Sequence, residues 1–137
     1  MSVSTLMSIT NHINDPVVAL LSNDDYLAHI IRSAIQTPWR LERHFYDAEM
    51  LDFLELADVR LVIVDDEAVS ERDCGWLLRK IRRNLEEAIL LYVAGNHNAE
   101  NERRARGNGA HYYTAKPVHS EELTGVLKGF MSRVNQA

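Results

Sequence analysis

The chain has 137 residues, of which 46% are hydrophobic and 26% are charged, and its formal net charge is −5. This length and composition indicate one globular domain that buries its own core and therefore needs neither disulfides nor bound metal to fold. The chain has one cysteine, so an intrachain disulfide is excluded. The negative net charge argues against nucleic-acid binding through bulk charge. The apolar runs are far shorter than the ~20 residues of a membrane span. We therefore expect a cytoplasmic protein with no membrane insertion and no direct nucleic-acid binding.

Short apolar runs alternate with longer amphipathic stretches along most of the chain. Residues 1–15 are mostly small and polar and are expected to form an N-terminal extension to a single domain over residues 16–137. Runs too short for a helix are predicted to be strands, and stretches with apolar residues on one helical face are predicted to be helices. In chain order we expect a strand at 17–21, a helix at 26–36, a strand at 39–45, a helix at 47–57, a strand at 61–64, a helix at 75–83, a strand at 88–93, a polar segment at 95–109, a strand at 110–114 and a helix from 120 onward.

Two helix starts and one weak segment carry further predictions. Asp47 is expected to cap the helix that runs to about residue 57, and Ser120 is expected to cap the last helix. The segment 95–109 has charged residues such as Arg103 where a helix would need an apolar stripe. Because a helix without such a stripe gains little from docking, we expect this one to be short, distorted or mobile.

This alternation predicts the fold class. Five strands separated by helices require crossover connections, which give a parallel sheet with helices on both faces, a three-layer α/β/α arrangement. In open sheets of this kind the working site lies at the carboxyl ends of the strands. That rule selects Ser22, Asn23, Asp65, the residues around Ala94, and Lys116 as candidate site residues.

Asp65 and Lys116 follow two strands of this sheet and invite three interpretations. They can form a structural ion pair. Alternatively, Asp65 is a carboxylate nucleophile that accepts a phosphoryl group, and Lys116 stabilises the phosphate oxygens. As a third interpretation, Lys116 anchors a small anionic ligand, although no glycine-rich phosphate loop supports this.

The segments Leu61-Val-Ile-Val-Asp65 and Gly109-Ala-His-Tyr-Tyr-Thr-Ala-Lys116-Pro117 resemble the receiver domain of two-component response regulators. The resemblance covers about residues 16–134 and implies a flavodoxin-like receiver fold with strand order 2-1-3-4-5. It also implies that Asp65 holds the position that accepts phosphate from a histidine kinase and that Lys116 contacts the phosphoryl group. Tyr113 matches the aromatic residue that changes rotamer on activation.

The sequence departs from the receiver pattern at the metal and switch positions. Ser22 and Asn23 stand where receivers carry the acidic pair that holds Mg²⁺ and, with Glu67, form a degenerate metal position, so Mg²⁺ binding is expected to be weak or absent. Asp24, Asp66 and Glu67 are the carboxylates whose side-chain reach could compensate. An alignment with Asp24 and Asp25 as the acidic pair is rejected, because it moves the apolar face of the first helix out of register.

The second departure is Ala94, which stands where receivers have the Thr or Ser that hydrogen-bonds the phosphate. Without this hydroxyl group, the usual coupling between that position and Tyr113 cannot operate in its usual form. The polar segment 95–109 also weakens the usual receiver dimer face, so a homodimer is allowed but its usual mode is doubtful.

These features predict an atypical, stand-alone receiver-like signalling module and not an enzyme. It would act through contacts with a histidine kinase or another signalling protein, and no output domain is expected. The alternative is a phosphorylation-independent pseudo-receiver scaffold, and a small enzyme or anion binder using Asp65 and Lys116 ranks third because a second catalytic group is missing.

Several other residues have simpler interpretations. The six histidines lie in different elements without ligand spacing, so a metal site is not predicted. Trp39 and Trp76 are expected to be packing residues and not a stacking platform. The basic cluster at 79–83 forms either a solvated helix surface or a docking patch.

Overall fold

The fold is one parallel sheet of five strands in the order β2-β1-β3-β4-β5. We describe residues 15–70 and 74–136 of a computed structural model, so nearly all of the expected extension at 1–15 lies outside the described residues. The strands are β1 (Val17–Leu21), β2 (Arg40–His44), β3 (Val59–Asp65), β4 (Ile89–Ala94) and β5 (Tyr112–Ala115). The predicted fold class and strand order are confirmed.

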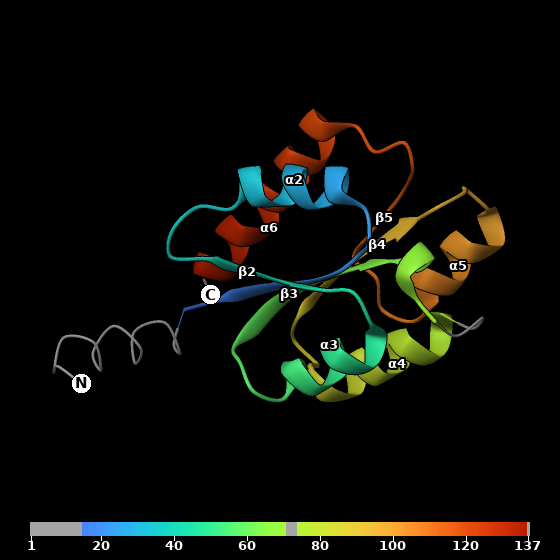
Figure 1. The fold of residues 1–137 in the computed structure, drawn as a ribbon, viewed down its shortest axis with the longest axis horizontal. Coiled ribbons are helices and arrows are strands. Elements are labelled where there is room, and N and C mark those ends of the chain that lie inside the picture. The colour runs from blue at the N-terminus through green and yellow to red at the C-terminus, as the bar shows by residue number, and fades with distance from the viewer. Residues whose placement is uncertain (1–14, 71–73, 137) are drawn as a thin grey trace, which may run out of the picture.

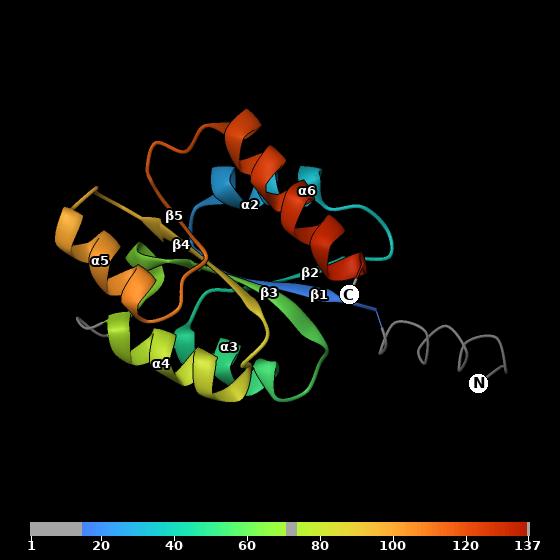
Figure 2. The same cartoon turned by 180° about the vertical axis from the view of Figure 1, so that it is seen from behind.

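Helices cover both faces of this sheet (Figure 1). They are α2 (Asp25–Ala34), α3 (Asp47–Leu54), α4 (Cys74–Asn84), α5 (Ala99–Gly107) and α6 (Ser120–Gln136), with a short 3₁₀ turn, η1 (Asp66–Ala68), after β3. Helices α2 and α6 lie on one face, and α3, α4 and α5 lie on the other (Figure 2). None of the helices in the described ranges combines the length and apolar character that a bilayer crossing requires.

Alternating side chains of the central strands supply two separate cores. In β3, Val62 and Val64 pack on the side of α3, α4 and α5, whereas Leu61 and Ile63 pack on the side of α2 and α6. All four side chains are fully buried. Because a strand buried on both faces has no polar face, its sequence is continuously apolar, which is why the central strands could be predicted from the sequence.

Asp47 does not cap α3, so that prediction is wrong. Tyr46 is the N-cap residue and makes no side-chain cap hydrogen bond, and the helix ends at Leu54 and not near residue 57. The Asp47 side chain is buried and accepts hydrogen bonds from the backbone NH of Ser70 at 3.2 Å and from Ser70 Oγ at 2.7 Å. Asp47 thus fastens the loop after β3, a long-range contact that a local sequence pattern does not indicate.

The segment 95–109 forms a short helix, as expected, but α5 is a regular α-helix of nine residues without distortion. Its only buried side chain is that of Ala105, which confirms the weak apolar packing. Asn98 Oδ1 accepts hydrogen bonds from the backbone NH groups of Glu100 and Asn101 and so caps the helix. The cap and two ion pairs along the helix supply the order that apolar packing does not.

The two tryptophans differ in burial. Trp39 is 7% exposed and packs in the core, as predicted. Trp76 is 38% exposed on α4, with Lys80 Nζ 5.8 Å from the centroid of its ring, so it is less buried than Trp39. The last helix begins at Ser120, but the backbone oxygen of His119 accepts its first helical hydrogen bond, from the backbone NH of Leu123 at 3.0 Å, so the prediction that Ser120 caps this helix is wrong. The helix buries Leu123 and Leu127 as predicted.

Candidate functional site

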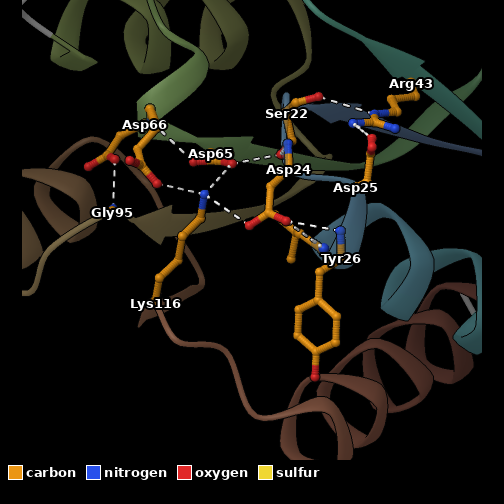
Figure 3. Close-up of polar contacts among 11 residues, drawn as sticks. Ser22, Asp24, Asp25, Tyr26, Arg43, Asp65, Asp66, Gly95 and Lys116 are labelled. Carbon is orange, nitrogen blue, oxygen red and sulfur yellow. Dashed lines mark hydrogen bonds and ion pairs between the residues drawn. The ribbon is translucent and has the colours of Figure 1, made fainter.

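The carboxyl ends of β1, β3 and β5 bring polar side chains together, and Figure 3 labels Ser22, Asp24, Asp65 and Lys116 among them. Ser22 and Asp24 follow β1, Asp65 ends β3, Glu67 lies in η1, and Lys116 follows β5. Parallel strands end at the same edge of a sheet, so residues separated by up to 94 positions become neighbours. The strand-end candidates Ser22, Asp65 and Lys116 meet in one network, together with Glu67 of the expected metal position.

Lys116 is the centre of this network. Its Nζ lies 2.8 Å from Asp65 Oδ2, 2.7 Å from Glu67 Oε1 and 3.2 Å from Asp24 Oδ2. Burial acts to lower the pKa of Lys116, but the hydrogen bonds and charges of these carboxylates outweigh it and raise the pKa above its ordinary value. The ammonium group therefore stays charged and holds the three carboxylates together.

Asp65 is 1% exposed, and both of its carboxylate oxygens have partners within the protein. Ser22 Oγ donates a hydrogen bond to Oδ2 at 2.6 Å, and Lys116 Nζ donates to the same oxygen at 2.8 Å. The backbone NH of Glu67 donates to Oδ1 at 3.1 Å. Because a buried carboxylate is stable only when it is paired and hydrogen-bonded, these three donors explain how a charge can lie at this position.

The three residues after β1 have different roles. Ser22 is fully buried, and its Oγ also accepts a hydrogen bond from the backbone NH of Asp24. Asp24 caps α2 by accepting from the backbone NH groups of Tyr26 and Leu27, and its other oxygen faces Lys116. Asn23 is exposed and lines the rim of the site.

Asp24 is one of the three carboxylates expected to reach the site and compensate for the missing acidic pair. Partial burial acts to raise its pKa, but the hydrogen bonds from the Leu27 backbone and Lys116 lower the pKa below its ordinary value. Sequence reasoning rejected Asp24 as a member of an acidic pair, and its side chain enters the network as the cap of α2. The signal that could have revealed it is a cap residue placed directly after a strand that ends at the site.

Glu67 and Asp66 point to different parts of the molecule, although they are adjacent in sequence. Glu67 reaches Lys116, and its chain passes so close to Gly95 that a Cβ there would lie 2.6 Å from Glu67 Cγ. Asp66 instead accepts hydrogen bonds from Tyr92 Oη at 3.0 Å and from the backbone NH of Gly95 at 2.8 Å. Asp66 therefore fastens the loop after β4 and lies outside the Lys116 network.

The carboxylate oxygens of this site face a lysine. Mg²⁺ requires nearly ideal octahedral coordination by oxygen ligands. Here the carboxylates of Asp24, Asp65 and Glu67 converge on the Lys116 ammonium. Within residues 15–70 and 74–136, no group of three His, Cys, Asp or Glu side chains is arranged to hold a metal ion.

The two switch positions lie on the adjacent strands β4 and β5. Ala94 is fully buried at the end of β4 and pairs with Ala115, so no hydroxyl group reaches the site from this position. Tyr113 is buried and stacks on Tyr92, with ring centroids 5.7 Å apart. Its hydroxyl group lies 3.3 Å from His97 Nδ1, which ties β5 to the loop before α5.

Tyr92 is a member of this region that sequence reasoning missed. Burial first, and then Cys74 and Asp66, raise the pKa of the Tyr92 phenol well above its ordinary value, so it remains a hydrogen-bond donor. It connects Asp66 to Tyr113 without using Ala94. In the sequence, Tyr92 is a single polar-tipped residue within an apolar strand, and this was the available signal.

A shallow cavity of about 290 Å³ opens over the network and is lined by Asn23, Asp24, Asp65, Glu67 and Lys116. Its walls carry the carboxylate that a phosphoryl donor would need to reach and the ammonium that would stabilise a phosphate. A small anion that entered it would have to displace the carboxylates from Lys116.

Comparison of the sequence with models of protein families and with curated proteins gives no match. Comparison of the structure with solved structures does give matches. A CheY-like response regulator receiver domain protein from Methanospirillum hungatei JF-1 has a TM-score of 0.74 at 18% identity, and the match covers 90% of this chain and 98% of that chain. HP1043, an orphan response regulator of H. pylori, has a TM-score of 0.73 at 17% identity, with 85% and 97% covered.

The chain has the fold of a receiver domain. The same fold occurs in a putative pilus assembly protein from Burkholderia thailandensis, with a TM-score of 0.67 at 16% identity over 85% of this chain and 98% of that chain. The receiver fold of this chain is thus shared by proteins with differently described roles, so what the chain does has to be argued from its own site.

Proposed function

We propose that the protein is an atypical receiver-like signalling module of the two-component type, located in the cytoplasm, in which Asp65 is held in a closed ion-pair network. It works through contacts with a histidine kinase or another signalling protein, without turnover of a substrate and without phosphorylation of Asp65. The observation that carries the proposal is that both carboxylate oxygens of Asp65 are engaged by Ser22, Glu67 and Lys116 within the protein.

The closed network opposes phosphoryl transfer for two reasons. The Asp65 oxygens would have to lose internal hydrogen bonds before one of them could attack phosphorus, and Lys116 is already neutralised by three carboxylates. Fewer groups than in a typical receiver are available to stabilise the transferred phosphoryl oxygens, because Ala94 has no hydroxyl group and Mg²⁺ is expected to bind weakly. Loss of one preorganised donor costs about 10²–10³ in rate in well-studied active sites.

Intact-mass measurement tests this proposal directly. The protein is incubated with Mg²⁺ and a small phosphodonor such as acetyl phosphate, and we expect no mass increase of one phosphate. Asp65→Asn is the control that identifies the site of any labelling. A mass increase in the wild-type protein that Asp65→Asn abolishes would contradict the proposal.

A variant in which the missing receiver residues are restored serves as the positive control. Ser22→Asp with Asn23→Asp and Ala94→Thr restores the acidic pair and the hydroxyl group. We expect this variant to bind Mg²⁺ more tightly by calorimetry and to be labelled by the phosphodonor. Sub-millimolar Mg²⁺ affinity in the wild-type protein would contradict the weak-metal part of the proposal.

A slow but genuine phospho-acceptor is the second candidate function. The cavity over Asp65 and Lys116 favours it, because that cavity gives a small donor a route to the carboxylate. The same mass measurement separates the two candidates, since slow labelling of the wild-type protein at Asp65 supports the second one.

A further inference from the structure

The neighbouring helices α3 and α4 carry opposite charge and lie on the same face of the sheet, away from α2 and α6 (Figure 1 and Figure 2). The chain from Phe45 to Asp58 contains five acidic residues and no lysine or arginine. Helix α4 contains four basic residues and no acidic residue. The opposite sign of the charge on these two adjacent helices is a feature of the surface that the Asp65 site does not explain.

The charged side chains of this face point to solvent. We define the acidic stripe as Glu49, Asp52 and Glu55, which are all exposed, and the basic stripe as Trp76, Lys80 and Arg83. The residues of the basic stripe are spaced four and three apart and therefore share one face of α4. Arg83 is exposed, Trp76 is 38% exposed, and Lys80 Nζ lies 5.8 Å from the centroid of the Trp76 ring.

The two stripes do not neutralise each other within the molecule. No ion pair between residues of the described ranges joins α3 to α4, and the ion pair made by Glu49 is with His44 of β2. Arg82 of α4 donates to backbone oxygens of Leu85, Glu86, Ala88 and Gly109, so the basic charge considered on this face is that of Lys80 and Arg83. The basic stripe combines an exposed tryptophan with basic side chains that α3 does not neutralise. Tryptophan and arginine are enriched among the residues that contribute most of the binding energy at protein interfaces.

The pairing of the stripes decides which partner fits. A partner of uniform charge would be attracted by one helix and repelled by its neighbour. A second copy turned about a two-fold axis between α3 and α4 places each acidic stripe opposite a basic stripe, twice. We propose that this face forms a symmetric homodimer in which Asp52 of each copy faces Arg83 of the other.

The size of the stripes indicates a transient dimer. Helices of 8 and 11 residues are about 12 and 16 Å long, so their contact belongs to the low end of the range for specific interfaces. Charge complementarity then supplies specificity, and Trp76 supplies apolar contact at the centre. This assembly does not depend on the chemistry of Asp65.

Charge reversal tests the proposal by sedimentation velocity over a concentration series. We expect the wild-type protein to form a reversible dimer. Asp52→Lys alone and Arg83→Glu alone should each raise the dimer dissociation constant roughly tenfold or more, because each places like charges opposite each other twice. An equimolar mixture of the two variants should dimerise again. In the mixed dimer, one contact pairs the two introduced charges, which are opposite, and the other contact keeps Asp52 facing Arg83.

Matched controls reverse the same charges on the opposite face of the sheet. Glu121→Lys and Lys128→Glu on α6 change the net charge equally and should leave the dimer unchanged. Trp76→Ala should also weaken the dimer, and circular dichroism confirms that each variant is folded. A wild-type protein that stays monomeric, a mixture that does not dimerise, or equal weakening by the α6 variants would each overturn the proposal.

Discussion

The protein uses ionic side chains in two contrasting regions, the Lys116 network at the strand ends and helix α5. In the network, the Asp65 side chain is 1% exposed and that of Lys116 is 18% exposed. On α5, the pairs Glu100–Arg104 and Glu102–Arg106 have side chains that are 35–73% exposed, at distances of 3.5 and 3.0 Å. The distances between the charges are similar in the two regions, but the access of water is not.

Because of this difference in solvation, the two regions should respond differently when one charged partner is removed. An exposed ion pair at helical spacing contributes about 0.3–0.5 kcal/mol, because water screens both charges whether or not they are paired. A buried pair contributes little beyond what an apolar pair would, but removal of one partner leaves a buried charge without compensation. The residues of the network thus depend on one another for stability, whereas α5 is stabilised by several small, independent local interactions.

The largest effect is expected for Lys116→Met. This change leaves the buried Asp65 carboxylate without its cation, and breaking such a pair costs about 3–5 kcal/mol of the free energy of unfolding. Urea denaturation measures the loss. The double variant Lys116→Met with Asp65→Asn should recover part of it, because the uncompensated charge is removed. Lys128→Met on exposed α6 is the matched control and should change stability by less than about 0.5 kcal/mol. A loss below about 1 kcal/mol for Lys116→Met would contradict the interpretation of the network as buried charge.

A smaller effect is expected for Asn98→Ala at the start of α5. The variant removes the side-chain oxygen that accepts from the NH groups of Glu100 and Asn101, and loss of such a cap costs about 1 kcal/mol. Because α5 buries only Ala105, the loss should appear as faster amide hydrogen exchange within α5 and little change elsewhere. Asn98→Asp, which keeps the cap, is the control. Equal changes in exchange across the whole sheet would show that α5 is coupled to the core.

The smallest effect concerns His111, which is exposed but uses its ring nitrogen in a hydrogen bond to the backbone. Its Nδ1 accepts a hydrogen bond from the backbone NH of Leu90, which requires the neutral ring. Partial burial, with the positive charges of Arg82 and Arg133, lowers the pKa of His111 below its ordinary value. The unfolded chain therefore binds this proton more readily than the folded protein does. The stabilisation is complete above the unfolded pKa of about 6.5 and is lost as the pH falls through the lower folded value.

Thermal unfolding between about pH 7.5 and pH 5 measures this contribution, because that interval spans the unfolded pKa. His111→Leu should unfold with a weaker dependence on pH than the wild-type protein, because the other five histidines are common to both. Identical pH dependence of the two proteins would show that His111 does not contribute.

The sequence was sufficient to predict which residues lie together at the strand ends, because their location depends only on the positions of the strands in the sheet. The apolar runs of β1, β3 and β4 determine a parallel sheet because strands buried on both faces have no polar face. Once the strand order is set, Asp65 and Lys116 lie at the same edge of the sheet, and both residues were selected from the sequence. The same reasoning selected Ser22, and the resemblance to receivers added Glu67, although neither could assign the partners of these side chains.

Only the tertiary structure decided which way neighbouring polar side chains turn. Asp24 reaches Lys116 and caps α2, Asp66 turns to Tyr92 while Glu67 turns to Lys116, and Asp47 fastens a distant loop instead of capping α3. A polar side chain takes whichever partner satisfies it best, and several lie within reach of each of these carboxylates. The sequence by itself determined the sheet and its ends, because burial of apolar surface follows periodicity. The choice among hydrogen-bond partners needs distances, which only the folded chain defines.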